Sequence, residues 1–255
     1  MDKNDLVYGR NSVEGILASS KRNINKIYLQ KGIKYDEKIK KIVDLAKTNN
    51  IIIQEVPKEK LNMMAGENHQ GIAASVSPVE YIDFDDFLSS IQSKTNNAMV
   101  IILDGVEDPH NLGSIIRTSV AAGADAIIIP RRRSSPVTPT VEKASAGAID
   151  KIPIIQVTNL NKAIEKLKEN HFWVIGAESS GEKYYFDIEY NDMNCAIITG
   201  GENQGISQLV KKNCDFLVKI PMPGNINSLN VANATSILIY EVIRQRIKQN
   251  ANIKS

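Results

Sequence analysis

Residues 194–246 read NCAIITGGENQGISQLVKKNCDFLVKIPMPGNINSLNVANATSILIYEVIRQR, and this stretch decides the predicted fold. Ala196–Thr199 is a short run of apolar and β-branched residues, which predicts a buried strand. The glycines of Gly200–Gly205 allow a close approach of the backbone to a ligand. Phe216–Ile220 predicts a second strand, and Asn227–Asn230 can cap a helix whose apolar residues recur with the helical period. Polar loops therefore follow predicted strands, where α/β sheets bind ligands.

The chain before this stretch, from residue 98 onward, alternates strands and helices. Ala98–Leu103 is a nearly continuous apolar run of the kind that is buried in a parallel sheet. In the polar loop that follows, Asn111 can cap a helix that ends at Gly123. Further strands are predicted at 126–129, 152–157 and 173–177, and a further helix at 160–170. This alternation predicts an α/β domain with a parallel sheet.

Residues 1–78 predict a separate and smaller α/β domain. Helices are predicted at 12–19, 36–48 and 58–65, and strands at 26–30, 51–56 and 70–76. Residues 79–97 are acidic and polar, and we interpret them as a linker that contains a short helix at 84–92. The predicted domains are therefore 1–78 and 98–255.

The net charge is only +2, but it is unevenly distributed. Residues 1–78 contain 13 Lys and Arg against 9 Asp and Glu, whereas residues 79–97 are net negative. A basic N-terminal part favours contact with RNA phosphates, although a solvated lysine-rich surface explains the same composition equally well. Arg10 and Asn11, at a helix start, could hold phosphate. The run Arg131–Arg133, directly after a predicted strand, could do the same.

Several functional classes are disfavoured by the sequence. No apolar run reaches the roughly 18–20 residues that cross a bilayer, and the N-terminus lacks a signal-peptide pattern. Cys195 and Cys214 lack CxxC spacing and the three histidines are scattered, so we expect buried thiols in the cytoplasm, no metal and no membrane. The chain also contains neither GxGxxG nor a P-loop.

Three ordered motifs resemble those of the SpoU/TrmH family of RNA ribose 2'-O-methyltransferases, in the SPOUT superfamily. They are Asn111-x-Gly113 with Arg117-Thr118, TGGENQGIS at 199–207, and IPMPGNINSLN at 220–230. Tyr8–Val13 and His69–Gly71 resemble the start and end of the L30e-like substrate-binding domain that precedes the catalytic domain in many members. The resemblance covers nearly the whole chain. It implies a C-terminal trefoil knot, which the residue pattern alone does not predict.

The resemblance also implies a cofactor, partners and site residues. The cofactor would be S-adenosylmethionine, the substrate structured RNA, and the assembly a homodimer through the catalytic domain. Cofactor binding would fall to Thr199, Gly200, Gly201, Ile220, Met222, Ser228 and Leu229. Catalysis would fall to Asn111, Arg117, Glu202, Ser228 and Asn230. The residues expected to contact RNA are Arg10, Asn11, Arg117, Arg131, Arg132 and Arg133.

Arg117 admits two interpretations. A ribose 2'-hydroxyl is a poor nucleophile, so methyl transfer needs alignment and a group that favours the alkoxide. The family suggests Arg117 as the base, but a guanidinium holds its proton in proteins. We therefore interpret Arg117 as an electrostatic clamp on the phosphate beside the reacting ribose.

The two-domain plan most resembles enzymes that methylate a guanosine ribose in 23S rRNA. One alternative is tRNA guanosine 2'-O-methylation, although that branch typically lacks the N-terminal domain. Another is methylation of an rRNA adenosine, as in the thiostrepton-resistance methyltransferases. A non-catalytic RNA-binding protein is disfavoured because all five candidate catalytic residues are present.

Overall fold

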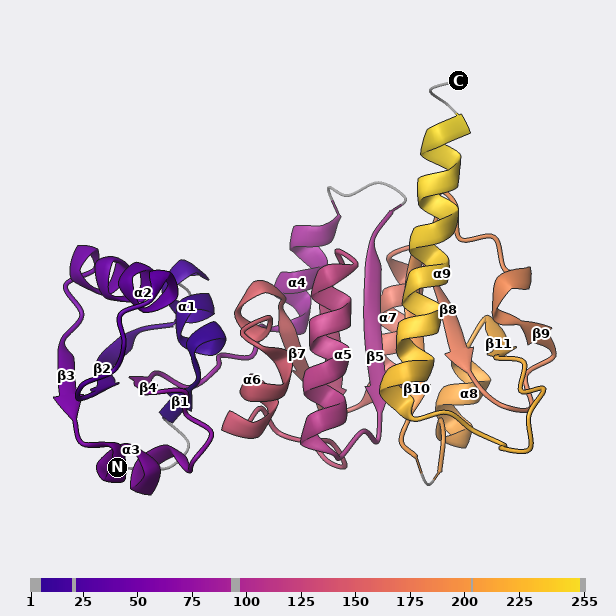
Figure 1. The fold of residues 1–255 in the computed structure, drawn as a ribbon. Helices are drawn as coiled ribbons and strands as arrows, with labels where there is room; N and C mark the ends of the chain where they lie inside the picture. The colour runs from indigo at the N-terminus through magenta and orange to yellow at the C-terminus, as the bar shows by residue number, and fades with distance from the viewer. Residues whose placement is uncertain (1–5, 20–21, 93–96, 203, 253–255) are drawn as a thin grey trace. The chain divides into compact units, whose positions relative to one another are not determined.

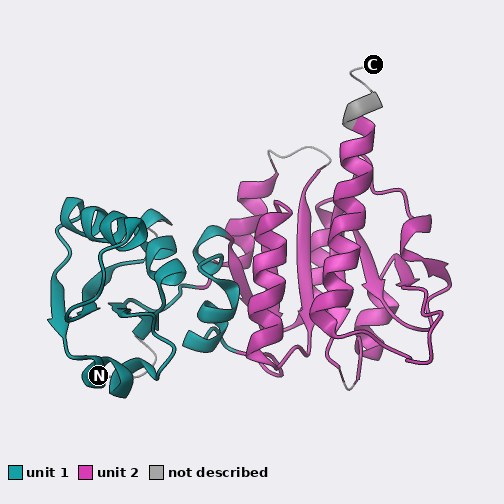
Figure 2. Cartoon of the chain, in the orientation of Figure 1, with its two compact units in different colours: residues 1–80, 136–151 teal, residues 81–135, 152–255 magenta. Residues whose placement is uncertain are grey.

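The computed structural model describes residues 6–19, 22–92, 97–202 and 204–252 (Figure 1). Residues 93–96 of the predicted linker and Asn203 of the glycine loop lie outside the described residues. The chain forms two compact units (Figure 2). Unit 1 contains residues 1–80 and 136–151, and unit 2 contains residues 81–135 and 152–255. The division predicted from the sequence kept 136–151 with the catalytic domain, whereas these residues pack with unit 1.

Unit 2 is built on a seven-stranded sheet in the order β7-β6-β5-β10-β8-β11-β9, and its strand pairings are parallel. In this sheet Ile197 lies opposite both Ile101 and Ile175. Because the strands are parallel, the carboxyl ends of neighbouring strands meet at one edge. The predicted parallel α/β sheet is confirmed. The strands are β5 (Met99–Asp104), β6 (Ala126–Pro130), β7 (Ile154–Val157), β8 (Phe172–Ala177), β9 (Lys183–Tyr184), β10 (Asn194–Gly200) and β11 (Phe216–Lys219).

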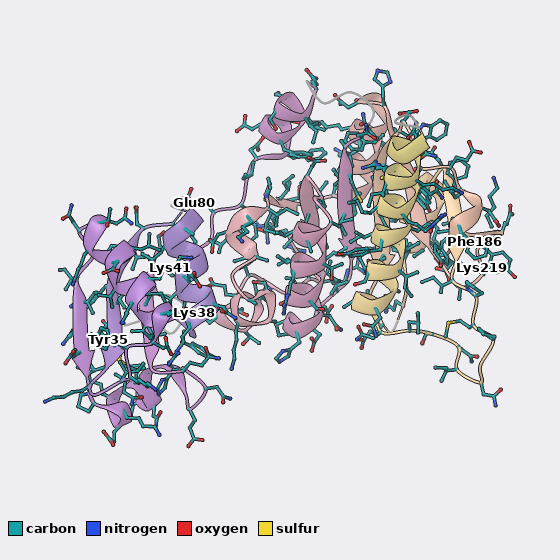
Figure 3. The ribbon with its side chains drawn as sticks, turned by 45° about the horizontal axis from the view of Figure 1, so that its top comes forward. Tyr35, Lys38, Lys41, Glu80, Phe186 and Lys219 are labelled. Carbon is teal, nitrogen blue, oxygen red and sulfur yellow. The ribbon has the colours of Figure 1, made fainter. Side chains whose placement is uncertain are left out.

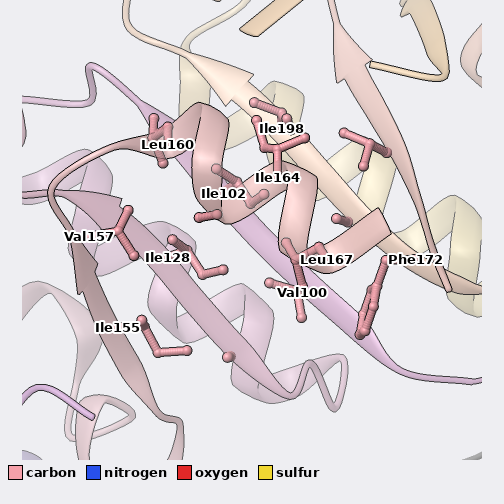
Figure 4. Close-up of a cluster of buried hydrophobic side chains, with 14 of the residues drawn as sticks. Val100, Ile102, Ile128, Ile155, Val157, Leu160, Ile164, Leu167, Phe172 and Ile198 are labelled. Atoms are coloured by element: carbon pink, nitrogen blue, oxygen red, sulfur yellow. The ribbon is translucent and has the colours of Figure 1, made fainter. Parts of the chain in front are cut away.

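Helices cover both faces of this sheet. On one face α4 (Phe84–Ile91), α7 (Leu160–Glu169) and α8 (Gln208–Asn213) bury apolar side chains against the strands. Figure 4 shows part of this core, in which Ile164 of α7 faces Ile102 and Ile198. On the other face α5 (Pro109–Ala121) and α9 (Val231–Asn252) contact each other (Figure 1). Among the described residues, every helix is too short or too polar to cross a bilayer.

The start of α5 differs from the prediction. Asp108, not Asn111, caps the helix, and its Oδ1 accepts a hydrogen bond from the Asn111 backbone N–H at 2.8 Å. Pro109 occupies the first turn, where a backbone N–H would have no acceptor within the helix, so a proline there loses no hydrogen bond. Asn111 therefore lies inside the first turn, and its side chain is available for other contacts.

Unit 1 contains a four-stranded sheet in the order β1-β4-β2-β3, which mixes antiparallel and parallel pairs. The short antiparallel strand β1 was not predicted. Ile39, Ile42, Val43 and Ala46 of α2 are all buried, as their helical spacing predicts. The strands are β1 (Leu6–Tyr8), β2 (Ile24–Gln30), β3 (Ile53–Val56) and β4 (Ile72–Val76), and the helices are α1 (Arg10–Ser19), α2 (Glu37–Thr48), α3 (Lys58–Ala65) and α6 (Pro139–Ser145), with a 3-10 turn, η2, at Ile149–Lys151.

Candidate functional site

The carboxyl ends of β8, β10 and β11 surround a cavity of about 530 Å³ in unit 2. We call it the first cavity. Its lining comes from residues that follow these strands and from the start of α9. All seven residues predicted to bind the cofactor line it, namely Thr199, Gly200, Gly201, Ile220, Met222, Ser228 and Leu229. Residues up to thirty positions apart in the sequence therefore line the same cavity.

The glycine loop is held by backbone contacts within the chain. A Cβ on Gly200 would lie 1.9 Å from the carbonyl carbon of Gly205, and one on Gly201 would lie 2.1 Å from the oxygen of Gly105. The Gly201 N–H also donates to the Asp104 carbonyl at 2.9 Å. These glycines are needed first because neighbouring backbone fills the space that a side chain would occupy. This packing holds the backbone of Gly200 and Gly201 at the wall of the first cavity.

Three predicted catalytic residues form one hydrogen-bonded cluster. The Asn111 Nδ2 donates to Glu202 Oε1 at 2.9 Å. The Asn230 Nδ2 donates to the same carboxylate oxygen at 3.0 Å and to Asn111 Oδ1 at 3.0 Å. The Oδ1 of Asn230 accepts from the Ala232 N–H at 2.9 Å, which caps α9. The first, second and third motifs are thus joined through one carboxylate.

A second cavity, of about 480 Å³, adjoins the first at the glycine loop, whose residues line both. Asn111 and Arg133 line it, and it shares Gly201, Glu202 and Val231 with the first cavity. Arg133 has a positive φ of 57°, an uncommon conformation for a non-glycine residue. The hydrogen-bonded cluster of Asn111, Glu202 and Asn230 therefore lies where two hollows share a wall.

The arginines predicted to act on RNA are placed differently. Arg117 is exposed on α5 and lies outside the lining of both cavities. Arg131 and Arg132 are exposed after β6 and line neither of the two cavities, whereas Arg133 lines the second. The structure of one chain therefore brings Arg133 to the site but not Arg117.

Arg10 and Asn11 belong to unit 1 and are held by local contacts. Arg10 pairs with Asp36, and its backbone N–H donates to Gln70 Oε1 at 3.1 Å. Asn11 accepts a hydrogen bond from Lys38 of α2, which Figure 3 labels together with Lys41. Both residues thus hold α1 to its surroundings as well as reaching solvent.

Several lining residues were not predicted from the sequence. Ala177, the last residue of β8, lines the first cavity together with Glu178 and Ser179, which follow it. Asp104, at the end of β5, is buried, and its Oδ2 accepts from the Ser207 N–H at 2.8 Å, which fixes the loop after the glycines. The signal that could have found them is position, because each ends a strand whose carboxyl end faces the site. Within the described residues, no group of His, Cys, Asp and Glu could hold a metal ion.

Comparison with known proteins gives matches over both parts of the chain. Residues 98–240 match the SpoU rRNA Methylase family, and residues 6–82 match the family described as RNA 2'-O ribose methyltransferase substrate binding. A protein of Staphylococcus epidermidis, named as a TrmH family tRNA/rRNA methyltransferase, is 50% identical over 241 residues, which cover 94% of this chain and 96% of that protein.

Two solved structures are similar in fold. The SpoU methyltransferase AviRb from Streptomyces viridochromogenes, in complex with AdoMet, has a TM-score of 0.78 at 22% identity and covers 95% of this chain and 90% of its own. An AdoMet-bound rRNA methyltransferase from Sinorhizobium meliloti has a TM-score of 0.79 at 24% identity and covers 94% and 86%.

Proposed function

Because the chain belongs to the SpoU rRNA methylase family, we propose that this RNA methyltransferase transfers a methyl group from S-adenosylmethionine to a ribose 2'-hydroxyl. The proposed substrate is structured RNA, and the proposed target is a guanosine of 23S rRNA. The observation that carries the proposal is the cluster of Asn111, Glu202 and Asn230 at the wall between two cavities. One hollow can take the methyl donor and the other the acceptor nucleotide.

The first cavity fits S-adenosylmethionine in size and in chemistry. Its volume of about 530 Å³ falls within the range of small-molecule sites. Ile220, Met222 and Leu229 offer apolar surface, while the loop after β10 offers backbone polar groups at its rim. When bound, the cofactor supplies a methyl group on a positively charged sulfur. The carboxylate of Glu202, which also lines the cavity, suits a cationic ligand, whereas that of Glu178 is paired with Lys211 at 2.7 Å.

The residues of this chain then have separable roles. Glu202 orients the two amides of Asn111 and Asn230, and through Asn230 it is tied to the first turn of α9. Asn111 and Arg133 face the second cavity, where a nucleotide would place its sugar and phosphate. A ribose hydroxyl fixed there would react faster because alignment is supplied before the reaction.

Arg117 completes the proposed site from a second copy of the chain. Its guanidinium would clamp the phosphate beside the reacting ribose and favour the developing oxyanion. Since Arg117 is exposed and lines neither cavity of its own chain, this role is best served in the predicted homodimer. The predicted knot belongs to the same proposal, and so does the assignment of unit 1 as the RNA-binding domain.

The test combines a cofactor measurement with a mapping of methylation. Calorimetry with S-adenosylhomocysteine should give saturable binding to the full chain. Mapping of 2'-O-methyl groups in rRNA and tRNA from a deletion strain should show one guanosine of 23S rRNA that loses its methyl group. A lost methyl in tRNA, or on an adenosine, would replace the proposed target. Loss of a base methyl with all ribose methyls intact would refute ribose methylation.

A further inference from the structure

Residues 136–151, which we call the strap, leave unit 2 after Ser135 and return to it at Ile152. The match to the methylase family spans them, yet they pack with unit 1 (Figure 2). Helix α6 of the strap contacts β1, and its η2 turn contacts α1. A connection between the adjacent parallel strands β6 and β7 could be made by a helix on their own sheet. The strap therefore has contacts that its linking role does not require.

Two glycines bring the strap into backbone contact with α1. A Cβ on Gly15 would lie 3.1 Å from the Gly147 oxygen and 3.2 Å from its Cα. A Cβ on Gly147 would lie 3.0 Å from the Asn11 oxygen. Ala146 and Gly147 both have positive φ, so the strap turns sharply where it meets α1. The contact is close because neither position carries a side chain.

A buried ion cluster fixes the same segment. Arg22, whose side chain is 4% exposed, has its Nη1 2.9 Å from Glu142 Oε1 and 3.9 Å from Asp150 Oδ1. Its Nε donates to the Ser77 carbonyl at 2.7 Å, so one guanidinium joins the end of β4 to both helical turns of the strap. Burial raises the pKa of Glu142 to about 7, against the opposing attraction of Arg22. Separating the strap from Arg22 would leave a buried guanidinium without its partners, which is strongly unfavourable.

The strap is joined to the second cavity by a short stretch of chain. Arg133 lines that cavity, and the Ser135 N–H donates to the carbonyl of Val106, another lining residue, at 2.9 Å. Only residues 136–138 separate Ser135 from the start of α6. Pro136 and Pro139 each fix φ and hold the residue before them extended. This short stretch is the covalent route by which a displacement of α6 could reach Ser135 and Arg133.

We infer that the strap positions the arginine loop of the second cavity from unit 1, with Arg22, Glu142 and Asp150 as positioning residues. Unit 1 then does more than bind substrate, because its packing against the strap sets the backbone that carries Arg133. The part of the inference that concerns reaction rate rests on the proposed function, whereas the part that concerns the loop does not.

The test uses Gly15→Val in the full chain. A side chain branched at Cβ cannot avoid Gly147, so it should drive the strap away from α1. Ala18→Val is the matched control, because Ala18 is exposed on the same helix. Hydrogen exchange should be at least ten-fold faster in Gly15→Val for the amides of 140–151 and of Ser135. The single-turnover rate with saturating RNA should fall at least ten-fold, with affinities for RNA and S-adenosylhomocysteine within two-fold of wild type.

The outcomes separate the inference from the proposed function. Faster exchange in the strap with an unchanged Ser135 amide, or with an unchanged methylation rate, would overturn positioning. Unchanged exchange throughout would show that the strap does not depend on α1 and would overturn it too. If the wild-type protein methylates no RNA, the proposed function fails, and the Ser135 amide alone still decides whether the strap holds the loop. A single cooperative melting transition well above the assay temperature shows that Gly15→Val remains folded.

Discussion

At the scale of single residues, each side chain in the cluster of Asn111, Glu202 and Asn230 makes more than one hydrogen bond. Asn230 caps α9 with its oxygen and reaches Glu202 and Asn111 with its nitrogen, so one side chain both starts a helix and joins two motifs. Glu202 accepts from both amides through one oxygen. Substitutions within this cluster should not be additive, because each removes a partner of the other two.

A pH dependence is expected from Glu142, in unit 1. Burial raises its pKa from 4.5 to about 7 in the folded chain. The folded state therefore binds this proton more tightly than the unfolded state, and the stability so gained is lost as pH rises from 4.5 to 7. A shift of this size corresponds to at most about 3 kcal/mol. In thermal unfolding, wild type should lose stability relative to Glu142→Gln as pH rises from 5 to 7.5.

The control for this prediction is Glu67→Gln, which removes an exposed carboxylate of the same unit. It should follow wild type across the pH range. A constant difference between wild type and Glu142→Gln at every pH would contradict the prediction, because it would mean that Glu142 does not change protonation on unfolding.

At the scale of elements, the sequence predicted most of the sheet and most of the first cavity. The strands of unit 2 are apolar runs bounded by polar loops, and parallel sheets place ligand sites at strand ends. Strand ends indicated the polar loops, whereas the resemblance to the SpoU/TrmH family supplied the grouping of Thr199, Ile220 and Ser228. The cap of α5 was misassigned because Asp108 and Asn111 are both good capping residues, and the choice between them depends on Pro109.

A helix at 139–148 was expected from the family resemblance, but neither the packing of the strap nor the shortest strands could be predicted in this way. Helix α6 has seven residues, too few to show which face is buried, and its burial depends on Arg22, more than a hundred residues earlier. Strands β1 and β9 have three and two residues, so their pairing is decided by partners far along the chain. Periodicity reports a local pattern, whereas these segments are fixed by distant contacts.

A prediction at the element scale concerns the glycine loop. Gly201→Ala should push the loop from Gly105, whose oxygen would lie 2.1 Å from the new Cβ. Overpacking of this kind costs about 1–3 kcal/mol, so affinity for S-adenosylhomocysteine should fall by about 5- to 150-fold. Gly224→Ala is the matched control, because nothing lies within 4 Å of a Cβ there. Equal affinities in calorimetry would show that the loop adapts without loss.

At the scale of the whole molecule, the position of Arg117 raises the question of a second chain. Asn111 and Arg117 lie on one helix, yet only Asn111 lines a cavity. The exposed Arg117 can act at the cavity of its own chain only if the bound RNA extends from that cavity to the surface of α5. In a homodimer it can instead serve the cavity of the partner, and the two arrangements predict different behaviour in mixed assemblies.

Mixed dimers of Arg117→Ala and Glu202→Ala should distinguish these arrangements. Each parent homodimer should be nearly inactive, with the single-turnover rate of Arg117→Ala lowered by about 10²–10³, as for loss of one preorganised donor. If Arg117 acts on the partner's site, a heterodimer purified through two different tags combines an intact Glu202 with an intact Arg117 at one site. By two-fold symmetry the other site lacks both, so the heterodimer should show about half the wild-type rate. If Arg117 serves its own chain, both sites are damaged and no activity returns. A chain that forms no dimer in sedimentation, but is fully active, would instead remove the partner from the mechanism.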